Sequence, residues 1–206
     1  MWLTQRRGVM AVTRIGVLGG TFDPIHVGHV ELARTAADEL NLNKVLLVPT
    51  WSQKFKNGSE VVSPEMRYHM CELAAVEDAR FEACDVDIVR NKVTLTLDTL
   101  TDLRKRMPGS EFFFILGSDS LRSFPRWTDY ERILELAHIV SAKRSGVVLS
   151  EAEMVDLDGF VHHWLNFKEH NVSSTEVRAA LASGGSMSNI LPPLVGRYIT
   201  DMGLYL

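Results

Sequence analysis

Residues 19–33 read GGTFDPIHVGHVELA and join an apolar, β-branched run to an amphipathic pattern typical of a helix. Glycines at a strand end let the backbone approach a bound group closely. The helix expected to start near Gly28 offers unpaired N–H groups and the positive end of its dipole. His26 and His29 bracket that start, and each imidazole can donate a hydrogen bond. The stretch therefore predicts a phosphate site, in which Gly28 removes a side chain that would block the phosphate.

Two other interpretations of the histidine pair stay open at this stage. The stretch matches neither GxxxxGK[ST] nor GxGxxG, so a structural turn with two surface histidines is one of them. A metal site is the other, but no third ligand stands at an obvious spacing from the pair. We therefore predict no metal-binding residue.

Apolar, β-branched runs alternate with amphipathic stretches along the whole chain. We expect strands at 14–19, 44–49, 81–87, 111–117, 138–143 and 161–167. We expect helices at 28–40, after the Ser63-Pro64 start, at 97–107, at 129–137 and in two C-terminal stretches. This alternation predicts an α/β, Rossmann-like, doubly wound fold with a mostly parallel sheet and helices on both faces. Ligands of such folds bind beyond the carboxyl ends of the strands, so residues 50–62 are a candidate wall of the site and residues 145–159 a surface connection.

Length and composition narrow the class of protein. The 206 residues fit one domain, which we expect at 14–206 after an N-terminal tail at 1–13, with Met10 an alternative start. A net charge of −4 leaves no broad basic field, so a nucleic-acid polymer is not expected as a partner. No apolar run is long enough for a bilayer. The two cysteines, Cys71 and Cys84, fit reduced buried thiols, and we expect a cytoplasmic protein with no membrane partner.

Two further stretches carry residues suited to a nucleotide. In VSSTEVR (172–178), Ser173 or Ser174 is expected to cap a helix, and Arg178 in its first turn could clamp phosphate oxygens. In GSDSLRSFPRW (117–127), Asp119 is expected at a strand tip, where a carboxylate can bind ribose hydroxyls, and the Trp127 indole suits a flat heterocycle. An ordinary cap with a surface arginine, and a core tryptophan, are the alternatives.

The stretch GGTFDPIHVGH closely resembles the G-[ST]-F-[DN]-P-x-H-x-G-H motif of the nucleotidyltransferase superfamily. The two stretches above and the ending LPPLVGRYITDMGLY are similar to the bacterial nicotinate mononucleotide adenylyltransferases, so the resemblance spans almost the whole chain. It implies transfer of AMP from ATP to nicotinate mononucleotide, giving nicotinate adenine dinucleotide and pyrophosphate in NAD biosynthesis. Mg²⁺ is expected on the ATP phosphates, held largely by ATP and water. ATP and nicotinate mononucleotide are the expected partners, and a homo-oligomer is left open.

The resemblance also implies roles for single residues. The expected catalytic residues are His26, His29 and Arg178. The expected ATP-binding residues are Gly19, Gly20, Thr21, Phe22, Gly28, Gly117, Asp119, Ser173, Ser174 and Thr175. The expected acceptor-binding residues are Thr96, which would bond the pyridine carboxylate, Trp127, which would stack on the ring, and Lys56.

The chain departs from the family pattern at two places. Leu95 replaces an aromatic residue before Thr96, and Phe55 replaces a histidine before Lys56, for which Lys54 is a competing register. These departures leave two alternatives open. One is an adenylyltransferase with another acceptor, nicotinamide mononucleotide or pantetheine phosphate. The other is a non-catalytic nucleotide-binding regulator, which the presence of both histidines and Arg178 disfavours.

Overall fold

The computed structural model describes residues 12–52, 62–142, 159–167, 172–185 and 189–205. Within them the strands are β1 (Arg14–Gly20), β2 (Lys44–Pro49), β3 (Phe81–Ala83), β4 (Glu111–Leu116), β5 (His138–Ala142) and β6 (Val161–Leu165). The helices are α1 (Val27–Glu39), α2 (Pro64–Ala75), α3 (Thr96–Arg106), α4 (Ser118–Ser123), η1 (Phe124–Arg126), α5 (Tyr130–Leu136), α7 (Ser174–Ala182) and α8 (Pro193–Met202).

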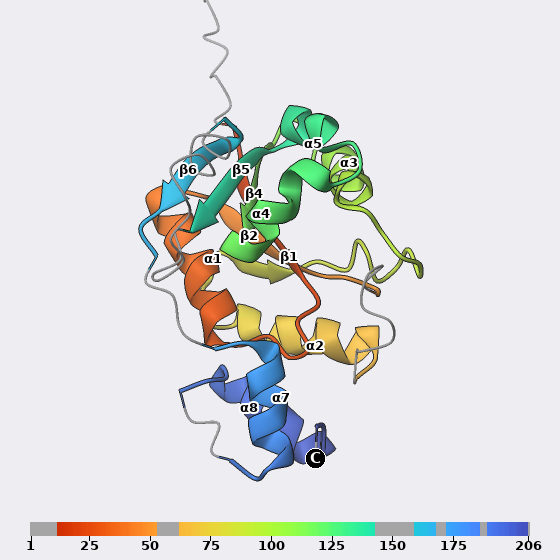
Figure 1. The fold of residues 1–206 in the computed structure, drawn as a ribbon, viewed down its shortest axis with the longest axis vertical. Coiled ribbons are helices and arrows are strands. Elements are labelled where there is room, and N and C mark those ends of the chain that lie inside the picture. Colours follow the sequence, from red (N-terminus) through yellow and green to blue (C-terminus); the bar gives the residue numbers. More distant parts are fainter. Residues whose placement is uncertain (1–11, 53–61, 143–158, 168–171, 186–188, 206) are drawn as a thin grey trace, which may run out of the picture.

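The six strands form one sheet in the order β3-β2-β1-β4-β5-β6, and every neighbouring pair is parallel. This order confirms the α/β, Rossmann-like fold expected from the sequence. The chain winds from β1 toward β2 and β3, then returns to place β4 on the other side of β1 (Figure 1). The reversal opens a crevice at the carboxyl ends of β1 and β4, which is where ligands bind in open parallel sheets.

Alternating strand residues face two separate hydrophobic cores. On one face Leu18, Leu47 and Ile115 pack with residues of α1, α2, α7 and α8. On the other face Val17 and Phe114 pack with residues of α3, α4, η1 and α5. Helices therefore cover both faces of the sheet, and α7 and α8 lie at one end of the molecule beside α2 (Figure 1). None of the helices in the described ranges is long and apolar enough to cross a membrane.

Helix starts follow from local sequence. The Ser63 side chain accepts a hydrogen bond from the backbone N–H of Met66 at 3.3 Å, and Pro64 occupies the first helical position of α2. Ser173 caps α7, with its hydroxyl accepting from the N–H of Glu176 while the Glu176 carboxylate accepts from the N–H of Ser173. Of the two serines considered from the sequence, Ser173 is thus the cap.

The structure differs from the sequence prediction at three places. The strand expected at 81–87 ends at Ala83, and beyond it Asp87 is buried and accepts a hydrogen bond from the Thr99 hydroxyl at 2.8 Å. The stretch after β4 forms α4 and η1, which the sequence did not predict. Arg178 lies at the fifth position of α7, just beyond the first turn. Most of the expected loops at 50–62 and 145–159, and Lys143 at the end of the fifth expected strand, lie outside the described residues.

Candidate active site

The loop between β1 and α1 sits at the crevice of the sheet. Its backbone turns sharply at Phe22, whose φ is 51°, and the Phe22 ring is buried. A Cβ atom at Gly20 would lie 2.9 Å from that ring, so the glycine allows the turn to close on itself. The ring in turn contacts His29 edge-on, with 5.0 Å between ring centroids. The Phe22 ring thus fills the inside of the loop and holds the His29 ring in place.

His26 and His29 lie against each other at the start of α1. His26 is the N-cap residue and is 6% exposed, and the two ring centroids are 3.7 Å apart. The backbone N–H of His26 donates to Nδ1 of His29 at 3.3 Å. Because Nδ1 of His29 accepts a hydrogen bond, the proton of the neutral ring sits on Nε2, which is the nitrogen left to donate to a ligand.

The surroundings of His29 decide its charge. Burial, with the neighbouring His26 as a smaller cause, holds the pKa of His29 well below its usual value. At neutral pH His29 is therefore an uncharged donor. Positive charge at the site comes from the helix dipole and from arginine instead.

Gly28 leaves room for the side chains packed around it. A Cβ atom at this position would lie 3.1 Å from Nδ1 of His26 and 3.4 Å from Val172. The glycine therefore makes room for the His26 ring and for the chain entering α7. The role that the sequence assigned to Gly28, leaving room for a phosphate, stays a prediction.

Helix α7 reaches the same loop from the far end of the sequence. The Ser174 hydroxyl donates to the carbonyl of Pro24 at 2.9 Å. Nη1 of Arg178 donates to the carbonyl of Asp23 at 2.7 Å, and Nη2 lies 3.4 Å from the hydroxyl oxygen of Thr175. The structure thus brings the α7 residues and the β1–α1 loop together, as the sequence predicted for one phosphate site.

Sequence reasoning missed Asp23 and Tyr205. The Asp23 carboxyl is 3% exposed and accepts a hydrogen bond from the Tyr205 hydroxyl at 2.6 Å. No short-range signal links two residues 182 positions apart. The one available hint was the aspartate standing between Phe22 and Pro24 in a glycine-rich loop.

Arg67 was missed as well. It is fully buried in α2, and its Nη1 donates to the carbonyls of Thr21 and Thr50 at 2.6 and 2.7 Å. Its Nη2 donates to the carbonyl of Trp51 at 2.8 Å. One guanidinium therefore ties the loop after β1 to the segment after β2. A signal did exist, because Arg67 stands in the helical stripe of buried residues that continues with Met70, Cys71 and Ala74.

Two of the predicted acceptor residues, Thr96 and Trp127, and two of the predicted ATP-binding residues, Gly117 and Asp119, belong to, or directly flank, the helices after β3 and β4. Gly117 caps α4 directly after β4, with open space around the position of a Cβ atom, and Asp119 falls in the first turn of α4, not at a strand tip. Trp127 follows η1 and packs edge-on against Phe124, and its Nε1 donates to the Ser123 hydroxyl at 3.0 Å. Thr96 is the first residue of α3. Lys56 lies outside the described residues.

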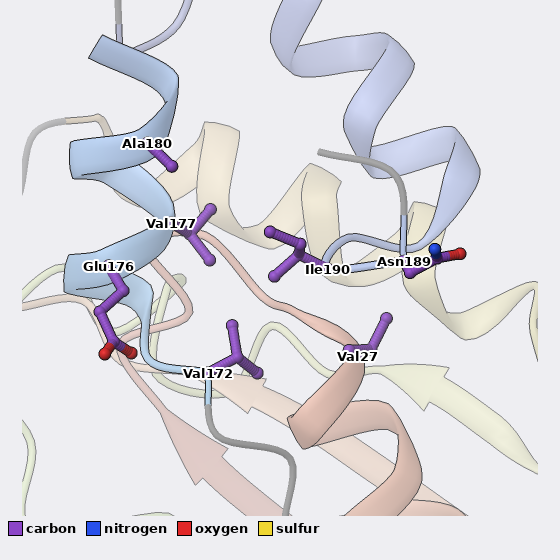
Figure 2. Close-up of a pocket in the computed structure, with 7 residues that line it drawn as sticks. All are labelled: Val27, Val172, Glu176, Val177, Ala180, Asn189 and Ile190. Atoms are coloured by element: carbon purple, nitrogen blue, oxygen red, sulfur yellow. The ribbon is translucent and has the colours of Figure 1, made fainter. Parts of the chain in front are cut away.

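An apolar pocket of about 430 Å³ adjoins the start of α1 (Figure 2). Figure 2 shows side chains from α7 on one side and Val27 and Ile190 on the other, with Glu176 the charged residue among those that line it. Val172 and Asn189 each adjoin a segment outside the described residues. We assign this pocket no ligand.

The donor set around the loop suits an anion better than a bare cation. Imidazole, hydroxyl and guanidinium groups converge there, whereas the buried Asp23 carboxyl is already engaged by Tyr205. In the part of the chain that the structure describes, no three His, Cys, Asp or Glu side chains are grouped so as to hold a metal ion. The hydrogen-bond donors that converge on the loop therefore suit an anion such as a phosphate group.

Comparison with known proteins gives the class first. The family model described as Cytidylyltransferase-like matches residues 17–180, a range that starts within β1 and ends within α7. A solved structure from Plasmodium falciparum, a nicotinic acid mononucleotide adenylyltransferase complexed with NaAD, superposes with a TM-score of 0.75 at 20% identity. It covers 94% of this chain and 97% of that one, and it supports the fold.

Two relatives narrow the class. A protein of Neisseria meningitidis serogroup B, named "Probable nicotinate-nucleotide adenylyltransferase", is 38% identical over 204 residues, covering 93% of this chain and 98% of the relative. A protein of Desulfitobacterium hafniense with the same name is 36% identical over 197 residues, covering 93% and 95%. The chain belongs to the cytidylyltransferase-like family and, within it, to the nicotinate-nucleotide adenylyltransferases.

Proposed function

We propose that this enzyme transfers AMP from ATP to nicotinate mononucleotide, forming nicotinate adenine dinucleotide and pyrophosphate in NAD biosynthesis. Identity of 36–38% to named nicotinate-nucleotide adenylyltransferases over nearly the whole chain supports the reaction. The observation that carries the mechanism is the convergence of His29, Arg178 and the α7 cap on the loop after β1.

The reaction needs positioning and charge stabilisation more than it needs a base. A phosphate oxygen of the acceptor attacks the α-phosphorus of ATP, and the bond to the β-phosphate oxygen breaks as pyrophosphate leaves. The attacking oxygen is already ionised, so no proton has to be removed from it. The enzyme gains most by holding the two phosphates in line and by stabilising charge that grows on the leaving group.

The chain's own groups divide these tasks. Nε2–H of His29 and the ring of His26 donate to the phosphates near the start of α1. Thr21 and Phe22 lie beside the α-phosphate, and Arg178 with the N–H groups at the start of α7 holds the β- and γ-phosphates. Magnesium arrives with ATP as part of the substrate, and its bound charge helps neutralise the triphosphate.

Acceptor recognition falls to the opposite face. We assign stacking on the pyridine ring to Trp127 and a hydrogen bond to its carboxylate to Thr96. Donors aimed at a carboxylate are poorly paired when an amide NH₂ faces them, and each mismatch costs about 1–3 kcal/mol. Two mismatches give a preference for the acid on the order of 10²-fold. Lys56 remains a proposed acceptor contact on sequence grounds.

Direct competition tests the proposal. Both mononucleotides are supplied at equal concentration with limiting ATP and Mg²⁺, and the dinucleotide products are separated by chromatography. We expect the acid dinucleotide to predominate. Comparable yields of the acid and amide products would contradict the acid-specific pocket. In a parallel reaction with phosphopantetheine as the sole acceptor we expect no product, and a product there, with none from either mononucleotide, would move the enzyme to that acceptor.

A variant locates the acceptor site independently. Trp127→Ala removes the stacking face and should raise KM for the acceptor while leaving KM for ATP nearly unchanged. Trp164→Ala, on β6, serves as the matched control and should change neither constant. A Trp127 variant that raises KM for ATP alone would remove this tryptophan from the acceptor site.

We also propose that residues 14–206 act as one catalytic domain in the cytoplasm, with small molecules as its substrates. Cys71 and Cys84 are buried free thiols, which suits a reducing compartment.

A further inference from the structure

Asp23 places a buried carboxyl group inside the proposed phosphate loop. It is 3% exposed and stands between Phe22, with its left-handed backbone, and Pro24, whose carbonyl accepts from Ser174. A buried carboxylate is tolerated only when hydrogen bonds or opposite charges replace its water. The groups that face it therefore decide which way it points.

Two groups from the C-terminal part of the chain face Asp23. The Tyr205 hydroxyl donates to Oδ1 at 2.6 Å. Nη1 of Arg178 donates to the backbone carbonyl of Asp23 at 2.7 Å and lies 4.0 Å from Oδ2. Arg178 is thus anchored to the loop by a neutral carbonyl, while the carboxylate beside it stays at the outer limit of an ion pair.

Tyr205 is held in this position by the end of α8. Gly203 ends the helix with a φ of 60°, and the N–H of Leu204 donates to the carbonyl of Ile199 at 3.0 Å. Leu204 and Tyr205 are both buried against the core that α7 shares. Burial and the bond to Asp23 raise the pKa of the tyrosine well above its usual value, which keeps the hydroxyl protonated as a donor.

We propose that Tyr205 is a positioning residue for ATP: by occupying Oδ1 of Asp23 it holds the ion pair with Arg178 at its long 4.0 Å distance and prevents a close, side-on pair, so that the guanidinium stays available to the phosphates. The inference rests on the proposed function through the role of Arg178. An arginine bound side-on to a carboxylate would have to break that charged pair before it could grip phosphate. Tyr205 thus weakens the competition of the Asp23 carboxylate with the phosphates for Arg178.

The first test is Tyr205→Phe, which keeps the buried ring and removes the donor. ATP affinity is measured by calorimetry with Mg²⁺ and without any acceptor, and kcat and KM are measured by pyrophosphate release. We expect ATP to bind about tenfold more weakly, the scale of one hydrogen bond to a charged group. KM for the acceptor should not change. Unchanged ATP affinity would overturn the inference.

The second test separates positioning from simple support of the loop. In Asp23→Asn the amide cannot form an ion pair with Arg178, although it still accepts from Tyr205. Tyr205→Phe should then weaken ATP binding much less than it does beside Asp23, and the double variant should bind ATP more tightly than Tyr205→Phe alone. Equal losses in both backgrounds would mean that the tyrosine only supports the loop, and would overturn the proposal.

Tyr198→Phe is the matched control. Tyr198 lies on α8, half-buried, with its ring against His69, and its loss of a hydroxyl should leave ATP affinity unchanged. Thermal unfolding of each variant without nucleotide reports any general damage. A wild-type chain that binds ATP but makes no dinucleotide would contradict the proposed acceptor reaction, whereas the Tyr205 comparison in ATP binding would still decide this inference.

Discussion

His29 combines a structural and a chemical role in a single ring. Its Nδ1 accepts a hydrogen bond from the N–H of His26, the residue that caps α1, as a glutamate does in a capping box. That bond leaves Nε2 as the donor, and the lowered pKa keeps the ring neutral. In the proposed reaction this Nε2–H would donate to the phosphates as charge develops on the leaving group.

Removal of this donor should be felt in the rate. We expect His29→Ala, and likewise His26→Ala, to lower kcat for pyrophosphate release by about 10²–10³ while the fold stays intact. His138→Ala is the control, because His138 begins β5 at the opposite, amino-terminal edge of the sheet. Near-normal kcat in either loop variant would remove that histidine from the phosphate site.

The buried carboxyl group of Asp87 lowers the stability of the fold when it is ionised. Burial raises its pKa to about 6, against the opposing effects of the Thr99 hydrogen bond and Arg90. Between about pH 4 and pH 6 the folded chain keeps a proton that the unfolded chain has lost. Stability from this group therefore falls as pH rises through that window, and the full penalty is present above pH 6.

Asp87→Asn should remove this penalty, since the amide oxygen still accepts from Thr99. We expect the free energy of unfolding to rise by about 1–2 kcal/mol at pH 7.5 and to change little at pH 4. Urea denaturation at both pH values measures the difference, and Asp201→Asn on the exposed side of α8 provides the control. A gain of the same size at both pH values would show that ionisation is not its cause.

At the scale of elements, Arg67 links α2 to the ends of β1 and β2. Arg67→Leu would leave three backbone carbonyls without their charged donor, so we expect a loss of about 3–5 kcal/mol in the free energy of unfolding. Arg67→Lys cannot reach all three carbonyls at once, so its free energy of unfolding should lie between those of the wild type and Arg67→Leu. Urea denaturation tests both against Arg197→Leu on the surface, and equal stability of all variants would exclude this bridging role.

The capping box of α7 makes a smaller prediction. Ser173→Ala removes an acceptor for the helix N-terminus and should cost about 1 kcal/mol. Ser183→Ala, at the other end of the same helix, removes a hydroxyl bonded to the carbonyl of Ala180 and should cost less than about 0.5 kcal/mol. Thermal unfolding without nucleotide compares the two, and a larger loss at Ser183 would contradict the assignment of the cap.

Most elements were predictable because their signals are local. Runs such as 45–49 are apolar throughout, as expected for a strand buried on both faces, and Ser63-Pro64 marks the start of α2 directly. Helix α4 has six residues and shows no periodicity, so nothing in its sequence distinguishes it from a loop. The burial of Asp87 beyond β3 involves a hydrogen bond with Thr99, a contact between separate elements that no single stretch of sequence reveals.

At the scale of the whole molecule, the sheet order accounts for the position of the site. With β1 and β4 adjacent at the reversal of the chain, the loop carrying His26 and His29 opens at the crevice. The sequence predicted the two histidines and Arg178, because a compact motif and a helix cap are visible in one dimension. It could not predict Asp23, Arg67 or Tyr205 as partners, since their bonds join separate elements.

Arg178 joins the C-terminal helix α7 to the loop after β1, so its substitution tests whether these distant segments form one site. Arg178→Lys keeps the charge but loses the planar fork that can hold Asp23 and a phosphate together, so kcat/KM for ATP should fall by about tenfold or more. The measurement is made at saturating acceptor, with Arg197→Lys as the control. An unchanged value would mean that Arg178 does not face the nucleotide.

The bonds from Asp23 to Arg178 and Tyr205 span 155 and 182 residues. A growing polypeptide thus exposes its signature motif early in translation but acquires the groups that shape it only at the end. A ribosome-bound chain that lacks these last helices has the motif loop without the residues that contact it from α7 and from the end of α8. Premature termination after β6 would accordingly remove the contacts of Ser174, Arg178 and Tyr205 with this loop all at once, so we expect a chain cut there to lose the proposed ATP site completely.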